Sequence, residues 1–268
     1  MSQQTSGDHQ ATIVEQFSQQ AIPFAQVPGH LDSIQLLIEL AEARQNDSVL
    51  DVACGPGLVA CEFACHCAHV TGIDITPAMI EQAKKRQQEK GLTNLTWVVG
   101  GALPLPYADY SFSLVITRYS YHHFLDPKAV LAEMIRVCKP EGWVLVADVA
   151  IDPAKSAAYD RLETMRDSSH AHALSTEEFI ALFQQSGLKE CRQSAYGVEI
   201  ELETQLKASF PKPGDTESLR EMITADIGVN GFGINAHRAN NTVVYTVPIG
   251  VFVGKKCDNG KLTNVVSC

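Results

Sequence analysis

Residues 48–57 read Ser-Val-Leu-Asp-Val-Ala-Cys-Gly-Pro-Gly. The apolar run at the start of this stretch predicts a short buried strand over 48–53, and the glycines predict a tight turn into a helix. Glycines in such a turn let the backbone approach a ligand closely, and the N–H groups that open the next helix face the same place. We therefore expect a ligand site where the first strand ends.

Strands and helices alternate downstream of this turn. Short apolar runs predict strands that are buried on both faces, which is typical of a parallel sheet with helices on either side. The predicted strands are 69–74, 95–99, 114–117 and 142–149, with a final pair at 188–196 and 242–253. The predicted helices start at 58, 77, 127 and 176, and one more lies near 216–225.

The composition argues against several classes of protein. The chain has 31 acidic and 21 basic residues and a formal net charge of −10, so it offers no basic face for nucleic acid. An acidic balance suits a cationic cofactor or a neutral small molecule. We find no export signal and no apolar run long enough to span a membrane, so a cytoplasmic location is expected. The eight cysteines are then expected to be reduced thiols.

Ligand-type residues follow each of the first four predicted strands, where a doubly wound sheet binds its ligands. Asp51 and the glycine loop end the first strand. Asp74 ends the second, where a carboxylate accepts hydrogen bonds from ribose hydroxyls. Residues 100–104 follow the third strand and are expected to bracket a flat ring, and residues 118–123 follow the fourth.

The glycine loop alone leaves two cofactor classes open. Residues 55–60 also satisfy the dinucleotide pattern G-x-G-x-x-G/A, with Asp74 at about the expected distance, so an NAD-dependent oxidoreductase is one alternative. Asp51 argues against it, because a carboxylate there would repel a pyrophosphate and attract a cationic amino group.

Five motifs that follow one another along the chain distinguish between these cofactor classes. They lie at 49–57, 72–79, 103–106, 122–127 and 136–142. Together they resemble the class I S-adenosylmethionine-dependent methyltransferases, and among these the type 11 group related to ubiquinone and menaquinone biosynthesis. The resemblance covers about residues 12 to 195. It implies S-adenosylmethionine as the cofactor.

The resemblance also implies roles for particular residues. Asp51 and the glycine loop would hold the methionine part, Asp74 the ribose, and Ala102 and Leu103 would flank the adenine. The complete expected cofactor set is Asp51, Ala53, Gly55, Gly57, Asp74, Ile75, Met79, Gly101, Ala102, Leu103 and Arg118.

The sequence departs from the family pattern at three positions. Ala53 replaces the usual first glycine of the loop, which is a mild change. Gly101 stands where an Asp commonly contacts the adenine amino group, and Ser113 replaces the usual Asp before the fourth strand.

Methyl transfer from a sulfonium is a direct displacement, so the protein mainly aligns the reactants and excludes water. A base is needed only where the acceptor must lose a proton. The candidate catalytic residues are Tyr119, His122, His123, Asp167 and His170. Alternatively, His122 and His123 only shape the loop beside the cofactor, and Asp167 and His170 belong to a capped polar loop.

Two further features can be interpreted in more than one way. Phe17, Phe24 and Phe232 could form a lid over an apolar acceptor or could be core residues. The run 61–69 contains cysteines and histidines but no paired C-x-x-C, and its cysteines fall on a helix that must pack on the sheet. We therefore expect no metal.

The predicted protein is one α/β domain with a Rossmann-like, doubly wound, seven-stranded, mostly parallel sheet, an antiparallel last strand and a helical insertion over the site. Its parts are a lid segment (1–30), the cofactor-binding core (31–198), the insertion (199–241), the final strand (242–256) and a tail (257–268).

The predicted function is methylation of a small molecule (a quinol, phenol or natural-product-like compound) at carbon, oxygen or nitrogen. An NAD-dependent oxidoreductase stays open as an alternative function, and so does an enzyme that binds S-adenosylmethionine without methylating. A monomer or homodimer is expected.

Overall fold

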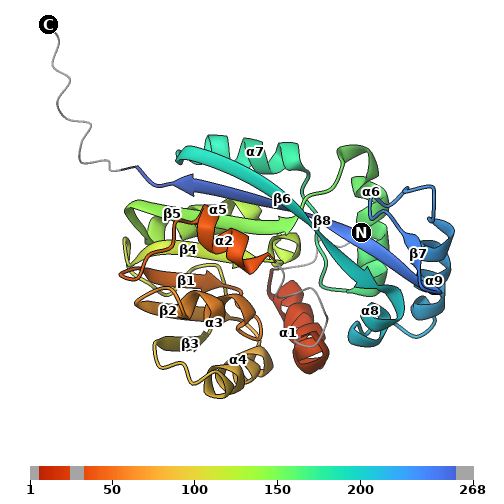
Figure 1. Ribbon diagram of the computed structural model, residues 1–268, viewed down its shortest axis with the longest axis horizontal. Coiled ribbons are helices and arrows are strands. Elements are labelled where there is room, and N and C mark those ends of the chain that lie inside the picture. The colour runs from red at the N-terminus through yellow and green to blue at the C-terminus, as the bar shows by residue number, and fades with distance from the viewer. Residues whose placement is uncertain (1–5, 25–32, 258–268) are drawn as a thin grey trace, which may run out of the picture.

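The computed structural model describes residues 6–24 and 33–257, and eight strands in this part form a single twisted sheet (Figure 1). Seven of them follow the order β3-β2-β1-β4-β5-β8-β6, and the short β7 pairs with β8 beside this path. The strands are β1 (Ser48–Val52), β2 (His69–Asp74), β3 (Leu95–Val99), β4 (Phe112–Arg118), β5 (Cys138–Val149), β6 (Lys189–Glu201), β7 (His237–Ala239) and β8 (Thr242–Lys255).

The strand directions agree with the sequence. Strands β1 to β5 run parallel to one another, and β8 runs antiparallel to both β5 and β6. The predicted mostly parallel sheet with an antiparallel strand near its end is confirmed. Strand β7 is not predicted by the sequence, because its three residues contain no apolar run and none of them is buried.

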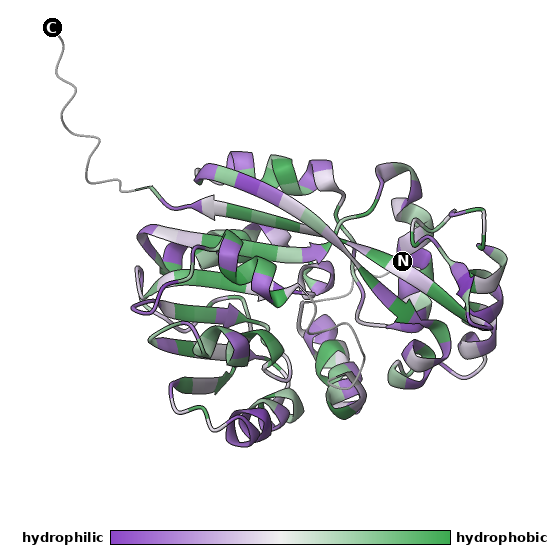
Figure 2. Ribbon diagram, viewed as in Figure 1, coloured by the Kyte–Doolittle hydropathy of each residue, from purple (hydrophilic) through white to green (hydrophobic). Residues whose placement is uncertain are grey.

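Helices lie on both faces of the sheet and at its edge. They are α1 (Ser6–Phe24), α2 (Ile34–Leu40), α3 (Leu58–Ala64), α4 (Pro77–Glu89), α5 (Pro127–Val137), α6 (Pro153–Arg166), α7 (Thr176–Gln185), α8 (Leu202–Ala208) and α9 (Asp215–Ala225), and the 3-10 turn η1 (Tyr121–His123) follows β4. Figure 2 shows that the central strands are hydrophobic along most of their length, whereas α4 is largely hydrophilic.

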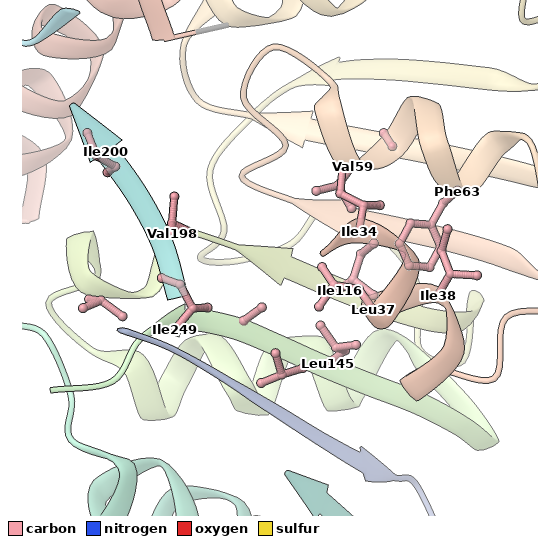
Figure 3. Close-up of a cluster of buried hydrophobic side chains, with 14 of the residues drawn as sticks. Ile34, Leu37, Ile38, Val59, Phe63, Ile116, Leu145, Val198, Ile200 and Ile249 are labelled. Atoms are coloured by element: carbon pink, nitrogen blue, oxygen red, sulfur yellow. The ribbon is translucent and has the colours of Figure 1, made fainter. Parts of the chain in front are cut away.

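Two hydrophobic clusters fill the space between sheet and helices. In one, side chains from α2 and α3 pack on β4 and β5, and the cluster continues along β6 and β8 (Figure 3). In the other, Leu131 and Met134 of α5 and Phe179 of α7 pack against Val115 and Val144 of the sheet. Because the central strands β1 and β4 are buried on both faces, they read as mostly apolar runs.

The predicted helix starts at 58, 77, 127 and 176 agree with the observed starts of α3, α4, α5 and α7. Ser175 forms a capping box at the start of α7, and the Asp126 side chain accepts a hydrogen bond from the Ala129 N–H at the start of α5. Thr76 occupies the cap position of α4, although its side chain makes no capping hydrogen bond.

Helix α6 is not predicted by the sequence pattern. Its start carries the same signal as α5, because Asp152 caps it and Pro153 is its first residue. Its apolar side is narrow, however, with Tyr159 and Leu162 as its buried apolar residues, so hydrophobic periodicity gives little indication.

Helix α1 and the insertion flank the end of the sheet where the ligand site is predicted. Figure 1 shows α1 between α4 and α8, and α1 contacts both of these helices. Helix α8 contacts β6 and β8, while α9 packs on α6. The insertion therefore covers the long outer strands, and α1 covers the ends of the parallel strands.

Candidate active site

A cavity of about 280 Å³ lies at the carboxyl ends of the parallel strands, under α1. Its wall contains every residue of the expected cofactor set except Gly57. Helix α1 contributes His9, Ile13 and Phe17 to the same wall. Of the expected lid residues, Phe17 lines the cavity, Phe232 packs against the core, and only the backbone of Phe24 lies within the described part.

The glycine loop after β1 has a left-handed backbone at several positions. Gly57 has φ +74, and a Cβ there would lie 2.7 Å from the Trp97 ring, so this position requires glycine. Gly57 therefore shapes the loop, although it does not itself line the cavity. Ala53 also has a positive φ, of 54, in place of the usual glycine, at a cost of about 1 kcal/mol.

Asp74 holds the glycine loop in place. Its Oδ2 atom accepts a hydrogen bond from the Gly55 N–H at 2.9 Å, and its Oδ1 atom accepts one from the Thr76 N–H at 2.8 Å. Burial raises the pKa of the Asp74 carboxyl, and the two backbone hydrogen bonds oppose that rise. The carboxylate oxygens have further lone pairs that a ligand hydroxyl can use.

Asp51 has a buried carboxylate with spare hydrogen-bonding capacity. The residue is 1% exposed, and its Oδ2 atom has no hydrogen-bond partner among the described residues. Burial raises the pKa of this carboxyl to about 7, although the nearby Arg118 guanidinium lowers it. A buried carboxylate with one oxygen that lacks a partner, on a cavity wall, suits a cationic ligand group and disfavours an anionic one.

A second cavity, of about 90 Å³, adjoins the first. Phe17, Tyr119 and His123 line both cavities, so they form the wall that the two share. Beyond this wall the second cavity combines an apolar side with a charged side. Its charged and polar members are Gln20, His122, Asp148, Glu163, Arg166, Asp167 and Gln205.

The pKa values of the neighbouring residues His122 and His123 are shifted in opposite directions. Burial alone would lower the pKa of His122, but the Asp148 carboxylate 2.6 Å from its Nδ1 atom raises the pKa overall. In His123, burial and the neighbouring His122 lower the pKa to about 3. Because the His123 Nδ1 lies 3.0 Å from the carbonyl oxygen of Ser169, we assign the proton of the neutral ring to Nδ1.

Of the other catalytic candidates, Tyr119 and Asp167 line the second cavity, whereas His170 does not. Asp167 accepts hydrogen bonds from the Ser169 N–H at 2.9 Å and from Gln20 of α1 at 3.3 Å. His170 lies outside both cavities, with its Nε2 atom 2.7 Å from Asp160. It can act on a ligand only through another residue.

Sequence reasoning missed part of the second cavity. Asp148 is buried near the end of β5, as the one charged residue in the apolar run 142–149. Glu163 lies on α6 and Gln205 on α8, and the sequence pattern predicts neither helix. A carboxylate at the carboxyl end of a buried parallel strand was the available signal.

Neither a metal centre nor a membrane-spanning helix is found in the described part of the chain. No group of three or more His, Cys, Asp or Glu side chains in residues 6–24 and 33–257 is arranged to hold a metal ion. Within the same ranges, no helix has the length and apolar character needed to cross a membrane.

Comparison with known proteins identifies the family. A family model described as "Methyltransferase domain" matches residues 50–146. The uncharacterised methyltransferase YcgJ of Bacillus subtilis is 32% identical over 195 residues, which cover 72% of this chain and 76% of the relative. The chain belongs to the methyltransferase family.

A solved structure and a second relative support the assignment to this family. The crystal structure of YcgJ matches with a TM-score of 0.77 and 26% identity over 86% of this chain and all of that one. The ubiquinone/menaquinone biosynthesis C-methyltransferase UbiE of Roseobacter denitrificans is 29% identical over 47% of the chain and 52% of the relative. The methyltransferase thus spans about half the length of that relative.

These findings confirm the predicted enzyme class. The protein is an S-adenosylmethionine-dependent methyltransferase with the predicted Rossmann-like fold. The oxidoreductase alternative is not favoured, in keeping with the carboxylate of Asp51 on the wall of the first cavity.

Proposed function

We propose that the methyltransferase binds S-adenosylmethionine in the first cavity and methylates a small organic acceptor in the second. The adjacency of the two cavities supports this proposal most directly, because Phe17, Tyr119 and His123 line both. This proposal places the donor and the acceptor on either side of those three side chains.

The charges of the first cavity suit this cofactor. The buried Asp51 carboxylate pairs with the amino group of the methionine part, and Arg118 on the same wall suits its carboxylate. Asp74 accepts hydrogen bonds from the ribose hydroxyls. The Gly101-Ala102-Leu103 segment packs on the adenine, as the family resemblance implies.

The residues around the cavities contribute alignment and exclusion of water. The bound cofactor supplies an electrophilic methyl group on a sulfonium sulfur. Helix α1 closes the first cavity and is fixed there, because the His9 Nε2 atom lies 2.7 Å from the carbonyl oxygen of His123 and Gln20 donates to Asp167. Covering the site in this way keeps water from competing with the acceptor.

The acceptor is proposed to be a quinol, phenol or natural-product-like compound, methylated at carbon, oxygen or nitrogen. The name of the UbiE relative, which refers to quinone biosynthesis, supports this class. The mixed apolar and polar lining of the second cavity also suits such a molecule. A cytoplasmic location and a monomeric or homodimeric state stay predictions from the sequence.

Calorimetric titration tests the cofactor assignment. We expect S-adenosylmethionine and S-adenosylhomocysteine to bind and NADH to give no signal. Asp51→Asn should weaken binding of both adenosyl compounds at least tenfold, whereas Asp109→Asn, in an exposed ion pair with Arg136, should not. Binding of NADH alone, or of none of the three compounds, would contradict the proposal.

A further inference from the structure

A carboxylate that the predicted catalytic set does not contain fixes the orientation of one catalytic candidate. The Nδ1 atom of His122 lies 2.6 Å from the Oδ1 atom of Asp148. Both side chains line the second cavity, and neither lines the first. Because an ionised carboxylate can only accept hydrogen bonds, the neutral form of His122 carries its proton on Nδ1, which leaves Nε2 as the basic nitrogen.

Asp148 is itself held rigidly. It is 1% exposed, and it also accepts hydrogen bonds from the backbone N–H groups of Tyr121 at 2.6 Å and Val149 at 2.7 Å. These hydrogen bonds and the contact with His122 lower the pKa of the Asp148 carboxyl, although burial alone would raise it. Asp148 therefore stays ionised and keeps one fixed position beside the imidazole.

The Nε2 atom of His122 is available to a ligand. No hydrogen bond to it is made by the described residues, and the His122 side chain keeps 15% exposure at the second cavity. The other titratable or charged groups that face this ring are His123 on η1, His170, and Glu163 with Arg166 on α6. His123 is neutral with a pKa of about 3, and Glu163 and Arg166 are paired with each other, so Asp148 dominates the environment of His122.

We propose that His122 is the general base of the methyltransferase, that Asp148 is its positioning residue, and that the acceptor is an uncharged compound with an ionisable O–H group. This inference rests on the function proposed above. The acceptor oxygen transfers its proton to His122 Nε2 and forms the new O–CH₃ bond as the C–S bond of the donor breaks. The products are a methyl ether, a neutral thioether and a protonated His122, which later releases its proton to solvent.

The charge of the second cavity supports an uncharged acceptor. Three carboxylates, of Asp148, Glu163 and Asp167, face it, against one guanidinium, that of Arg166. Arg166 donates to Glu163 through Nε and Nη2 and to the Ser209 hydroxyl through Nη1. An anionic acceptor would therefore meet excess negative charge. An ammonium would be stabilised in its protonated form, which opposes transfer to nitrogen.

The shape and lining of the cavity limit the acceptor further. Its volume of about 90 Å³ admits nothing larger than a single ring. The apolar part of its wall consists of Phe17, Val149, Val198, Ile200, Val247 and Ile249. A phenol-type ring matches this arrangement, because its ring packs on apolar side chains while its hydroxyl reaches the base.

Three probes of equal ring size test the acceptor class. We would titrate 4-nitrophenol, 4-nitroaniline and 4-nitrobenzoate into the full chain saturated with S-adenosylhomocysteine, at a pH where free 4-nitrophenol is protonated. We expect 4-nitrophenol to bind and to show the visible absorbance of its phenolate, and 4-nitrobenzoate to bind at least tenfold more weakly. Equal or tighter binding of 4-nitrobenzoate or 4-nitroaniline, or no binding of 4-nitrophenol, would overturn the inference.

Variants then test the two residues. His122→Gln should abolish the phenolate absorbance and lower the rate of 4-nitrophenol methylation by roughly 10²- to 10⁴-fold, the usual contribution of a general base. Added imidazole should restore part of the rate to His122→Ala, which a purely structural role of His122 would not allow. His69→Gln is the control, because His69 is exposed at the amino end of β2.

Asp148→Asn should lower the pKa of His122, measured by NMR of ¹⁵N-labelled imidazole nitrogens, and reduce methylation at least tenfold. An unchanged pKa of His122 would remove Asp148 from the mechanism. If Asp148→Asn does not fold, the result rests on His122→Gln and the imidazole rescue. Calorimetry with S-adenosylhomocysteine is run on every variant, so loss of cofactor binding, which concerns the proposed function, is distinguished from loss of proton transfer alone.

Discussion

Asp74 at the end of β2 accepts a hydrogen bond from the backbone N–H of Gly55 at 2.9 Å, which joins the second strand to the glycine loop after the first. The same carboxylate lines the first cavity, where we propose that the cofactor binds. One side chain thus both fixes the loop and faces the ligand, so its loss should affect cofactor binding in two ways.

We expect Asp74→Ala to weaken the binding of S-adenosylhomocysteine more than tenfold, because the ribose loses its acceptor and the loop loses its anchor. Asp74→Asn should have a smaller effect, since its amide oxygen can still accept one hydrogen bond. Calorimetry on both variants measures this. Unchanged affinity in Asp74→Ala would refute the ribose assignment.

The pKa of Asp51 predicts a pH-dependent affinity for the cofactor. The carboxyl of the free enzyme has a pKa of about 7, and a cationic amino group binds only its ionised form. Affinity should therefore reach a plateau above pH 7 and fall by up to about tenfold per pH unit below it. Titrations with S-adenosylhomocysteine between pH 5.5 and 8.5 would show this slope, and Asp51→Asn should flatten it.

The buried Asp51 carboxylate should also lower the stability of the free enzyme. Its folded pKa of about 7 lies above the ordinary value of 3.8, so folding favours the protonated form, and this contribution to stability is lost as the pH rises through 7. We expect Asp51→Asn to raise the melting temperature by several degrees at pH 8 and to change it little at pH 4. Differential scanning calorimetry at both values is the measurement, and a lower melting temperature at pH 8 would contradict the argument.

Gly101 offers a gain-of-affinity test. A Cβ at this position would have its nearest neighbour at 3.9 Å, and the backbone does not adopt a positive φ, so a side chain fits without strain. Gly101→Asp should bind the cofactor more tightly by about 1 kcal/mol, because it supplies an acceptor for the adenine amino group. Gly101→Ala is the matched control and should change little. Equal affinities of the two variants would show that the adenine amino group lies elsewhere.

Glu163 and Arg166 form an ion pair beside the second cavity, with side-chain exposures of 11% and 15%. Glu163→Gln leaves the guanidinium without its counter-charge and should lower the free energy of unfolding by about 3 kcal/mol. Glu217→Gln breaks the exposed pair with Arg220 and should cost less than about 1 kcal/mol. Urea denaturation of both variants gives the comparison, and equal losses would mean that burial does not strengthen the Glu163 pair.

The sequence by itself determined the sheet and most of the first cavity. Strand β1 and residues 142–149 of β5 are mostly apolar because helices cover both faces of the sheet, and that pattern needs no knowledge of distant residues. The first-cavity residues Asp51, Asp74 and Ala102 lie at or just after the ends of parallel strands, and the carboxyl ends of such strands meet at one edge. Local pattern and this single topological rule were enough to group them.

Only the tertiary structure assembled the second cavity. Gln20, Asp148, Arg166 and Gln205 come from four elements far apart in the chain, and α6 and α8, which carry the last two, gave no clear periodic signal. Their meeting depends on how α1 and α6 pack at the ends of the long strands β6 and β8. The same packing gave His122 a raised pKa and its neighbour His123 a lowered one. Adjacent residues of one type differ in this way because burial and neighbouring charge, which arise from the fold, control ionisation.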